Sequence, residues 1–232
     1  MYTPTELISH KGQFGGTDLA QQGGTLAELA QICQAWGAAV AALHAAAVRR
    51  SSAPLAARPW VADPEHVTAS MRPAARGFGY AAVLRAYESS RDLRAAASEV
   101  DARWTELHWI HGNLNAFNVL VEQRPALRVS FVDPQDAGLG DSAWDLASAI
   151  DMITWLAPRW RAMPQPLVDY FLLGYRRAGG PGRLYPAIQA VRSLATAMWI
   201  ADLPHGSEAE LPFWLDQARS HAARVGCLMA VA

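Results

Sequence analysis

The sequence predicts a mainly α-helical fold with one small β-hairpin. Most of the chain between its glycine- and proline-rich stretches has the character of helix, beginning with a long amphipathic segment after Thr25. Two short runs rich in β-branched residues, 118–121 and 129–133, are the strand candidates. With 232 residues, of which 51% are apolar and 18% charged, the chain can bury one substantial core. We therefore expect a single domain over residues 25–232, preceded by an N-terminal tail or hinge remnant at 1–24.

The first helix has both a start signal and an apolar stripe. Thr25 and Glu28 form a capping box, in which the two side chains satisfy free amides at a helix N-terminus. Apolar residues then recur at alternating steps of four and three on one helix face, down to His44. The members of this stripe are Leu29, Cys33, Trp36, Val40 and Leu43. The pattern predicts a long helix that packs against a core.

The two strand candidates should pair as a hairpin, because Pro125 suits the second position of a turn over residues 124–127. A turn symmetric about these four residues places Asn118 opposite Asp133, with Cα atoms roughly 4.5–5.5 Å apart. An amide oxygen and a carboxylate so placed could share one Mg²⁺, which takes oxygen ligands and fills its shell with waters and nucleotide phosphates. Asn118 and Asp133 are therefore the candidate metal- and nucleotide-binding residues.

Further helices are predicted on both sides of the hairpin. One covers residues 82–109, where His111-Gly112 breaks the pattern, and another is capped by Ser142 and runs to about Leu156. Residues 48–79 are rich in Arg, Pro, Ala and Ser without a clear period, which is typical of a long surface loop. Three more helices complete the expectation, at 165–177, 185–203 and 208–229.

Charge and composition exclude several classes of partner. A net charge of −1 gives no electrostatic basis for nucleic-acid binding, and no uninterrupted apolar run of 18 residues suggests a membrane span. The N-terminal residues have neither a basic segment nor an apolar core, so we expect no signal peptide and a cytoplasmic protein. Cys33 and Cys227 match no metal-ligand spacing and are interpreted as core thiols.

The motifs after residue 110 resemble the phosphotransfer centre of the aminoglycoside phosphotransferase family, which includes choline kinase-like enzymes. The residues that carry the resemblance are His111-Gly112-Asn113-Leu114-Asn115-Ala116-Phe117-Asn118, then Asp133-Pro134, then Gly140-Asp141-Ser142-Ala143-Trp144-Asp145-Leu146-Ala147. The resemblance implies ATP and Mg²⁺ as cofactors, with Asn118 and Asp133 holding the metal.

One substitution stands at the centre of this motif. The resemblance places Asn113 where the family has the aspartate that receives the substrate hydroxyl proton, and an amide is no base, so impaired catalysis is expected. His111 and Gly112 are expected to shape the loop. Asp145, in the first turn of a helix, either complements the helix dipole or, as the resemblance implies, accepts hydrogen bonds from the catalytic-loop backbone.

The same resemblance suggests a missing nucleotide clamp. Residues 36–44 resemble the helix that opens the C-terminal lobe of the family, and only about 24 residues precede that helix. Of the 20 basic residues only Lys11 is a lysine, and it follows no strand that could present it to a phosphate. The nearby glycines lack the flanking elements of a phosphate loop. We therefore expect a kinase-like C-terminal lobe without most or all of the N-terminal lobe.

Three functions remain open from the sequence. The first is a degenerate kinase-like protein that acts as a binding or scaffolding subunit, because a lobe without its cover would expose apolar surface. The second is an active ATP-dependent phosphotransferase acting on a hydroxyl of a small molecule or a peptide Ser/Thr, with a partner chain supplying the missing lobe. The third is a nucleotide or small-ligand sensor.

The expected partners follow from these alternatives. A protein partner or a second copy of the chain would cover the exposed lobe face, and a peptide substrate is the further partner that these alternatives imply. Small phosphotransferase-like proteins that this chain resembles take part in bacterial modification of ribosomally made peptides of the lanthipeptide or thioamitide type. No nucleic-acid or membrane partner is expected.

Overall fold

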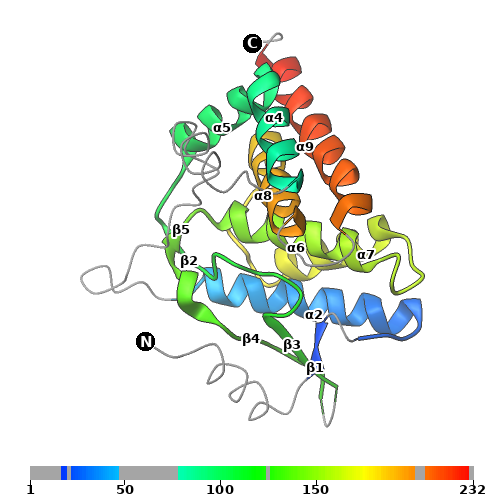
Figure 1. Ribbon diagram of the computed structural model, residues 1–232. Helices are drawn as coiled ribbons and strands as arrows, with labels where there is room; N and C mark the ends of the chain where they lie inside the picture. The colour runs from blue at the N-terminus through cyan, green and yellow to red at the C-terminus, as the bar shows by residue number, and fades with distance from the viewer. Residues whose placement is uncertain (1–16, 20–21, 47–77, 124–125, 202–206, 230–232) are drawn as a thin grey trace. The chain divides into compact units, whose positions relative to one another are not determined.

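The computed structural model describes residues 17–19, 22–46, 78–123, 126–201 and 207–229 (Figure 1). The fold is mainly α-helical with two small antiparallel sheets, which confirms the predicted fold class. The chain divides into two compact units, one formed by residues 1–56 and 107–182 and the other by residues 57–106 and 183–232. The predicted single domain over 25–232 and tail over 1–24 stay predictions, although residues 17 and 18 of that tail form a strand.

The first unit contains three helices, α2 (Leu26–His44), α6 (Ser142–Leu156) and α7 (Pro164–Arg177). The predicted capping box starts α2, since Thr25 N donates to Glu28 Oε2 over 2.7 Å and Glu28 N donates to Thr25 Oγ1 over 3.3 Å. Most of the predicted stripe is buried, including Cys33, whose thiol pKa burial raises to about 12. Cys33 is therefore a core thiol, as predicted.

Two glycines allow α2 and α7 to cross at close range. A Cβ on Gly37 would lie 2.0 Å from Phe171 O, and a Cβ on Gly174 would lie 2.0 Å from Gln34 O. Both distances are far below van der Waals contact, so only glycine permits this backbone approach. The close crossing explains why a residue of low helix propensity stands inside each helix.

α2 is also the one helix, among the residues that the structure describes, that is long and apolar enough to cross a membrane. A core helix of a water-soluble protein meets the same criterion. α2 packs along α7 and buries nine of its residues, among them Trp36 and Val40. This packing favours a core helix.

Two small sheets complete the first unit. Strand β1 (Thr17–Asp18) pairs with β3 (Val119–Glu122), which pairs with β4 (Arg128–Phe131), and β2 (His108–Ile110) pairs with β5 (Gly138–Gly140). All of these pairs are antiparallel. The β3–β4 hairpin was predicted, whereas β1 and the β2–β5 pair were not.

The predicted register of the hairpin is wrong by one residue. Val119 pairs with Phe131 and Glu122 pairs with Arg128, so five residues, 123–127, connect the strands instead of the four assumed. Val132 N therefore donates to Asn118 O over 3.0 Å, and Asp133 does not oppose Asn118. In the observed register Val119 lies opposite Phe131 and Val121 lies opposite Val129. A slip of one residue would turn these side chains to the other face of the sheet.

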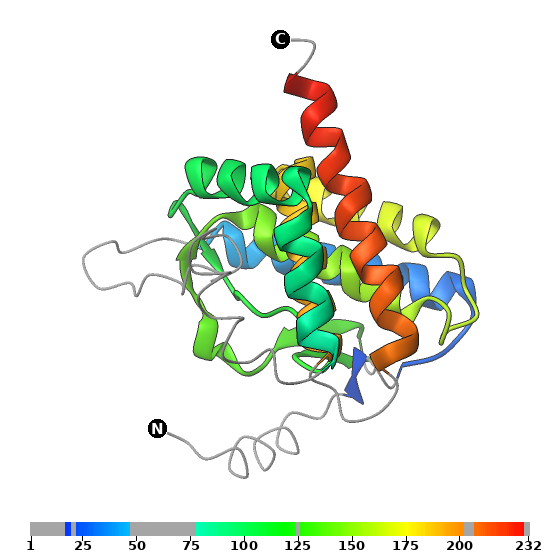
Figure 2. The same ribbon diagram turned by 45° about the horizontal axis from the view of Figure 1, so that its top comes forward.

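The second unit contains α4 (Phe78–Ser89), α5 (Arg91–Arg103), α8 (Pro186–Ala201) and α9 (Ser207–Met229). Figure 2 shows α9, in orange and red, beside α4, and α8 also packs on α9. The predicted helix over 82–109 is wrong in two respects. Ser90 interrupts it, since its side chain caps α5 by accepting from Leu93 N over 3.2 Å, and residues 108–110 form β2.

Several predictions fall on residues outside the described part of the chain. Lys11 and its glycine-rich surroundings lie there, as does nearly all of the predicted surface loop over 48–79. The side chain of Cys227 is also outside it. The other predicted helices agree with α7, α8 and α9 to within two residues at each end.

Candidate functional site

The candidate site is a loop of the first unit that connects β2 to β3 and contains His111, Asn113 and Asn118. Strand β2 holds one end of this loop against β5, with Ile110 paired to Gly138. β3 holds the other end in the hairpin. A single 3₁₀ turn, η3 (Pro134–Asp136), links the hairpin to β5 and brings a second segment to the loop.

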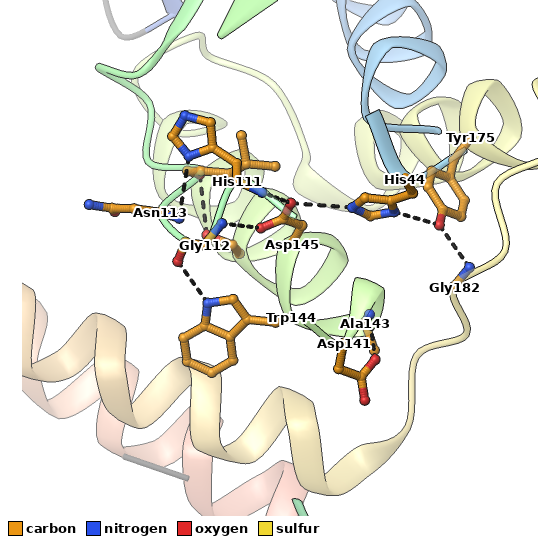
Figure 3. A network of polar contacts seen from close by, with 12 residues as sticks. His44, His111, Gly112, Asn113, Asp141, Ala143, Trp144, Asp145, Tyr175 and Gly182 are labelled. Atoms are coloured by element: carbon orange, nitrogen blue, oxygen red, sulfur yellow. Dashed lines mark hydrogen bonds and ion pairs between the residues drawn. The ribbon is translucent and has the colours of Figure 1, made fainter. Parts of the chain in front are cut away.

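Asp145 supports the loop from below. It lies in the first turn of α6 with no exposed surface, and its two carboxylate oxygens accept from the backbone N–H of His111 over 2.7 Å and of Gly112 over 3.0 Å (Figure 3). Hydrogen bonds to a charged acceptor are roughly twice as strong as neutral ones. These two bonds therefore hold the loop backbone against the first turn of α6.

The carboxylate of Asp145 also connects the loop to α2 and α7, through contacts that were not predicted from the sequence. Asp145 Oδ2 lies 3.2 Å from His44 Nε2, His44 Nδ1 lies 2.8 Å from the Tyr175 hydroxyl, and Gly182 N donates to that hydroxyl over 2.8 Å (Figure 3). Burial, more than any neighbour, raises the pKa of Tyr175 to about 12. His44 and Tyr175 therefore form a buried polar chain between α2, α6 and α7.

α6 makes two further contacts with the loop. The Trp144 indole Nε1 donates to Gly112 O over 2.9 Å, and the Ser148 hydroxyl donates to Leu114 O over 3.2 Å. The helix itself is capped by Asp141, which accepts from Ala143 N over 2.9 Å, and not by the predicted Ser142. One helix face thus satisfies both amides and carbonyls of the loop.

His111 has both ring nitrogens engaged inside the site. Its Nε2 lies 2.9 Å from Val132 O, which can only accept, so Nε2 carries the hydrogen and Nδ1 accepts from Asn113 N over 3.3 Å. The ring is 3% exposed. His111 is therefore held by both ring nitrogens and shapes the loop.

Asn113 is held by its side chain on both sides. Its amide nitrogen donates to Asp136 Oδ2 over 3.2 Å, and its amide oxygen accepts from Asn115 Nδ2 over 3.1 Å. Its backbone carbonyl accepts from the Asn118 amide nitrogen over 3.0 Å. Asn113, which the resemblance places at the position of a catalytic aspartate, is thus an amide held beside a carboxylate.

The two candidate metal-binding residues differ in how the protein satisfies them. Asn118 uses its amide nitrogen in the bond to Asn113, which leaves its amide oxygen as the atom for a cation. Asp133 has a carboxylate oxygen, Oδ1, that is buried and has no hydrogen-bond partner among the described residues. A buried carboxylate oxygen without a donor is costly unless a cation or water meets it.

The backbone of Asp133 is strained at this position. Its φ and ψ are both 61°, in the left-handed region, and it precedes Pro134, a place where an extended conformation is preferred. Strain of this kind is retained where the surrounding structure requires a particular side-chain direction. The orphaned oxygen of Asp133 is of the type that Mg²⁺ prefers, and Mg²⁺ needs only one or two protein ligands. No cluster of three His, Cys, Asp or Glu side chains that could hold a metal occurs among the described residues.

Three residues of this site were not predicted from the sequence: His44, Tyr175 and Asp136. A signal existed for His44, because a histidine at the end of an apolar helix stripe needs a buried polar partner. A signal also existed for Asp136, since an amide at position 113 invites a search for another carboxylate near the loop. Tyr175 had no local signal.

Comparisons with known proteins agree with this geometry. The model of the phosphotransferase enzyme family matches residues 14–190. The structure is similar to that of an aminoglycoside-3′-phosphotransferase of type VIII, at 18% identity and a TM-score of 0.56, covering 78% of this chain and 65% of that one. It is also similar to a choline kinase of Streptococcus pneumoniae, at 13% identity and a TM-score of 0.54, with 91% and 68% covered.

A third similar structure is a glucosamine kinase, at 14% identity and a TM-score of 0.51, with 88% of this chain and 58% of that one covered. The chain thus spans between 58% and 68% of the length of these three proteins. No curated protein matches the chain in sequence. The family match covers most of the chain and the three structures share its fold, so the predicted resemblance is confirmed, and the chain belongs to the phosphotransferase enzyme family.

Proposed function

We propose that the chain binds Mg²⁺ and ATP at Asn118 and Asp133 and transfers the γ-phosphoryl group to a hydroxyl. The observation that carries this proposal is the buried Oδ1 of Asp133, which has no hydrogen-bond partner among the described residues. A site that had lost its ligand would be expected to relax or to fill this gap with a donor. The protein instead keeps a strained aspartate there.

Each residue has a separate task in this proposal. Asn118 and Asp133 hold Mg²⁺, which neutralises the charge that develops on the phosphates. Asp145 holds the backbone of the loop in place through His111 and Gly112. Because phosphoryl transfer depends mostly on positioning and electrostatics, a neutral residue at position 113 does not by itself exclude turnover. We place this activity in the cytoplasm, on a small-molecule or peptide hydroxyl.

Calorimetric titration of the chain with Mg·ATP tests this proposal. Wild-type protein should bind, and Asp133→Asn, which keeps the shape but removes the charge, should weaken binding by at least ~10-fold, the loss typical even of an outer-shell partner. Asp169→Asn is the matched control, since Asp169 is an exposed aspartate on α7 whose carboxylate accepts from Gln165 Nε2 over 2.9 Å. Absence of binding by the wild type would reject the proposal.

A second candidate is a binding or scaffolding subunit, and one observation favours it. Phe117, in the loop itself, is 39% exposed and stands edge-on to Trp155 with ring centroids 6.3 Å apart. The Arg159 guanidinium lies 3.8 Å from the centre of the Trp155 ring. Aromatic residues and arginine are enriched in protein contact sites, and Phe117 is exposed here while Trp155 is half-buried. We infer that this surface would hold a protein or peptide partner, such as a second copy of the chain or a subunit for peptide modification.

Sedimentation equilibrium tests the scaffold candidate. Self-association should be weakened by Phe117→Glu and unaffected by Met163→Gln, a matched change at an apolar side chain that is 74% exposed outside this surface. A chain that sediments as a monomer and co-purifies with no second protein contradicts this candidate. Calorimetry and sedimentation together distinguish the two functions, because binding Mg·ATP is required only by the first.

A further inference from the structure

We propose that Asp136 supplies the carboxylate that receives the substrate hydroxyl proton, in place of the residue at position 113. This inference rests on the proposed phosphotransferase function. It begins from one contact, the hydrogen bond of 3.2 Å from Asn113 Nδ2 to Asp136 Oδ2. The amide at the expected position of the base thus points at a carboxylate from another segment. The two residues together present the charge that one aspartate would have presented.

The fold holds Asp136 at this place by its backbone. Asp136 ends η3, two residues before β5, and the pairing of Ile110 with Gly138 fixes that strand beside the start of the loop. Gly112 makes the approach possible. Its φ is 79°, and a Cβ there would lie 2.4 Å from Asp136 O and 3.1 Å from Asp136 Cβ. Gly112 therefore has a second task besides its bond to Asp145, which is to leave room for Asp136.

The described hydrogen bonds occupy only one oxygen of Asp136. Oδ2 accepts from Asn113, which leaves Oδ1 for a substrate hydroxyl, and the residue is only half-buried, so a substrate can reach it. η3 also separates Asp136 from Asp133 by a single turn. The metal-binding carboxylate and the proton acceptor thereby stand at the two ends of one short 3₁₀ turn.

The other titratable groups at the loop are less suitable. Both ring nitrogens of His111 are engaged within the loop, by Val132 O at 2.9 Å and Asn113 N at 3.3 Å. Asp145 has no exposed surface and uses both oxygens to hold the backbone. Asp133 also has an oxygen without a partner, but the proposed function assigns that residue to the metal, so Asp136 is the carboxylate that remains for the substrate hydroxyl.

The step itself balances without a further reactant. The substrate O–H bond breaks and its proton passes to the Asp136 carboxylate. The hydroxyl oxygen forms a bond to the γ-phosphorus of ATP as the bond from that phosphorus to the bridging oxygen breaks, and the electron pair leaves on ADP. Protonated Asp136 then returns the proton to water. Asn113 donates a hydrogen bond to the same carboxylate and orients it.

An exchange of the two side chains tests the assignment. ADP formation from Mg·ATP, with water as the acceptor, is measured for wild type, for Asp136→Asn and for the double variant Asn113→Asp with Asp136→Asn. Asp136→Asn should lower the rate by about 100-fold or more, the usual contribution of a general base. The double variant, which moves the carboxylate to position 113, should recover most of the rate. Asp169→Asn serves as the control with unchanged rate.

Two further readouts separate this inference from a structural role and from failure of the proposed function. Asp136→Asn keeps an oxygen that can accept from Asn113, so a role that is only structural would leave the rate unchanged, and that result would overturn the inference.

Calorimetric Mg·ATP affinity should stay within ~3-fold of wild type in both variants, because the metal-binding residues are intact. Wild type that binds without forming ADP, or a double variant as slow as Asp136→Asn, would also overturn it, whereas no binding by wild type rejects the proposed function. The melting temperature of each variant establishes that it is folded. If a variant with Asp136→Asn is not folded, Asp136→Ser takes the place of that substitution.

Discussion

Replacing Asp145 with alanine should remove the support of the catalytic loop and destabilise the first unit. The change leaves the N–H groups of His111 and Gly112 buried without an acceptor, and it leaves His44 Nε2 without its carboxylate. Each buried group that loses its partner costs about 1–3 kcal/mol. We expect the free energy of unfolding to fall by about 3–5 kcal/mol, a large share of the roughly 5–15 kcal/mol of an ordinary domain.

Urea unfolding followed by far-ultraviolet circular dichroism measures this loss. The chain has two compact units, so wild type must first be tested for a single transition with a second probe such as tryptophan fluorescence. Asp145→Asn keeps the shape and one acceptor oxygen and should lie between wild type and Asp145→Ala. Asp169→Ala, at an exposed aspartate of α7, should change stability by less than about 0.5 kcal/mol. A loss below about 1 kcal/mol for Asp145→Ala would refute the argument that this carboxylate holds the loop.

Three other predictions can be tested with the same protein. Gly37→Ala should lower the melting temperature despite the better helix propensity of alanine, because its Cβ would lie 2.0 Å from a backbone oxygen of α7, and overpacking costs about 1–3 kcal/mol. In a Cys227→Ser variant, Cys33 should not react with a thiol reagent at pH 8 until the protein is unfolded, because burial raises its pKa to about 12. His221 has its pKa lowered, first by burial and then by Arg224, so it stabilises the native state above its unfolded pKa of about 6.5 and this contribution is lost as the pH falls through its lower native pKa. Thermal melts between pH 5 and 8 should show a smaller acid-side loss for His221→Gln, and equal losses would contradict the assignment.

The helices could be predicted well from the sequence because their signals are local. The capping box at Thr25 and the stripe down to His44 each lie within a few turns, and both are present in the structure. The prediction of one helix over 82–109 was wrong where the local signal was weak. Ser90 offered a cap within a run of good helix formers, and three residues, 108–110, are too few to show the two-residue period of a strand.

The hairpin shows the limit of register arguments. The strands were correctly placed, but a connection of four residues and one of five are equally compatible with a turn near Pro125. The difference of one residue moved Asp133 out of the ladder and into a left-handed conformation. The position of Asp133 relative to Asn118 could therefore not be derived from pairing alone, and a metal site at these two residues stays a prediction.

The parts of the site that could not be predicted are those that join distant positions. His44 and Tyr175 are 131 residues apart, and His44 and Asp145 are 101 apart. Their contacts depend on how α2 and α7 cross, which Gly37 and Gly174 permit and which no local pattern encodes. The amide at position 113 gave a reason to look for another carboxylate, but the approach of Asp136 to the loop depends on the pairing of β2 with β5, which was not predicted.

The bonds from the loop to Asp145 have a consequence for the exchange of amide hydrogens with solvent. Amides of a connecting segment normally exchange fast, since opening them costs little free energy. The N–H groups of His111 and Gly112 donate instead to the carboxylate of Asp145, which has no exposed surface. They can exchange only when the first turn of α6 separates from the loop, so their protection factors should equal those of the core amides of α6. A connecting segment with the exchange rates of a helix interior would identify this loop as part of the last region of the unit to open.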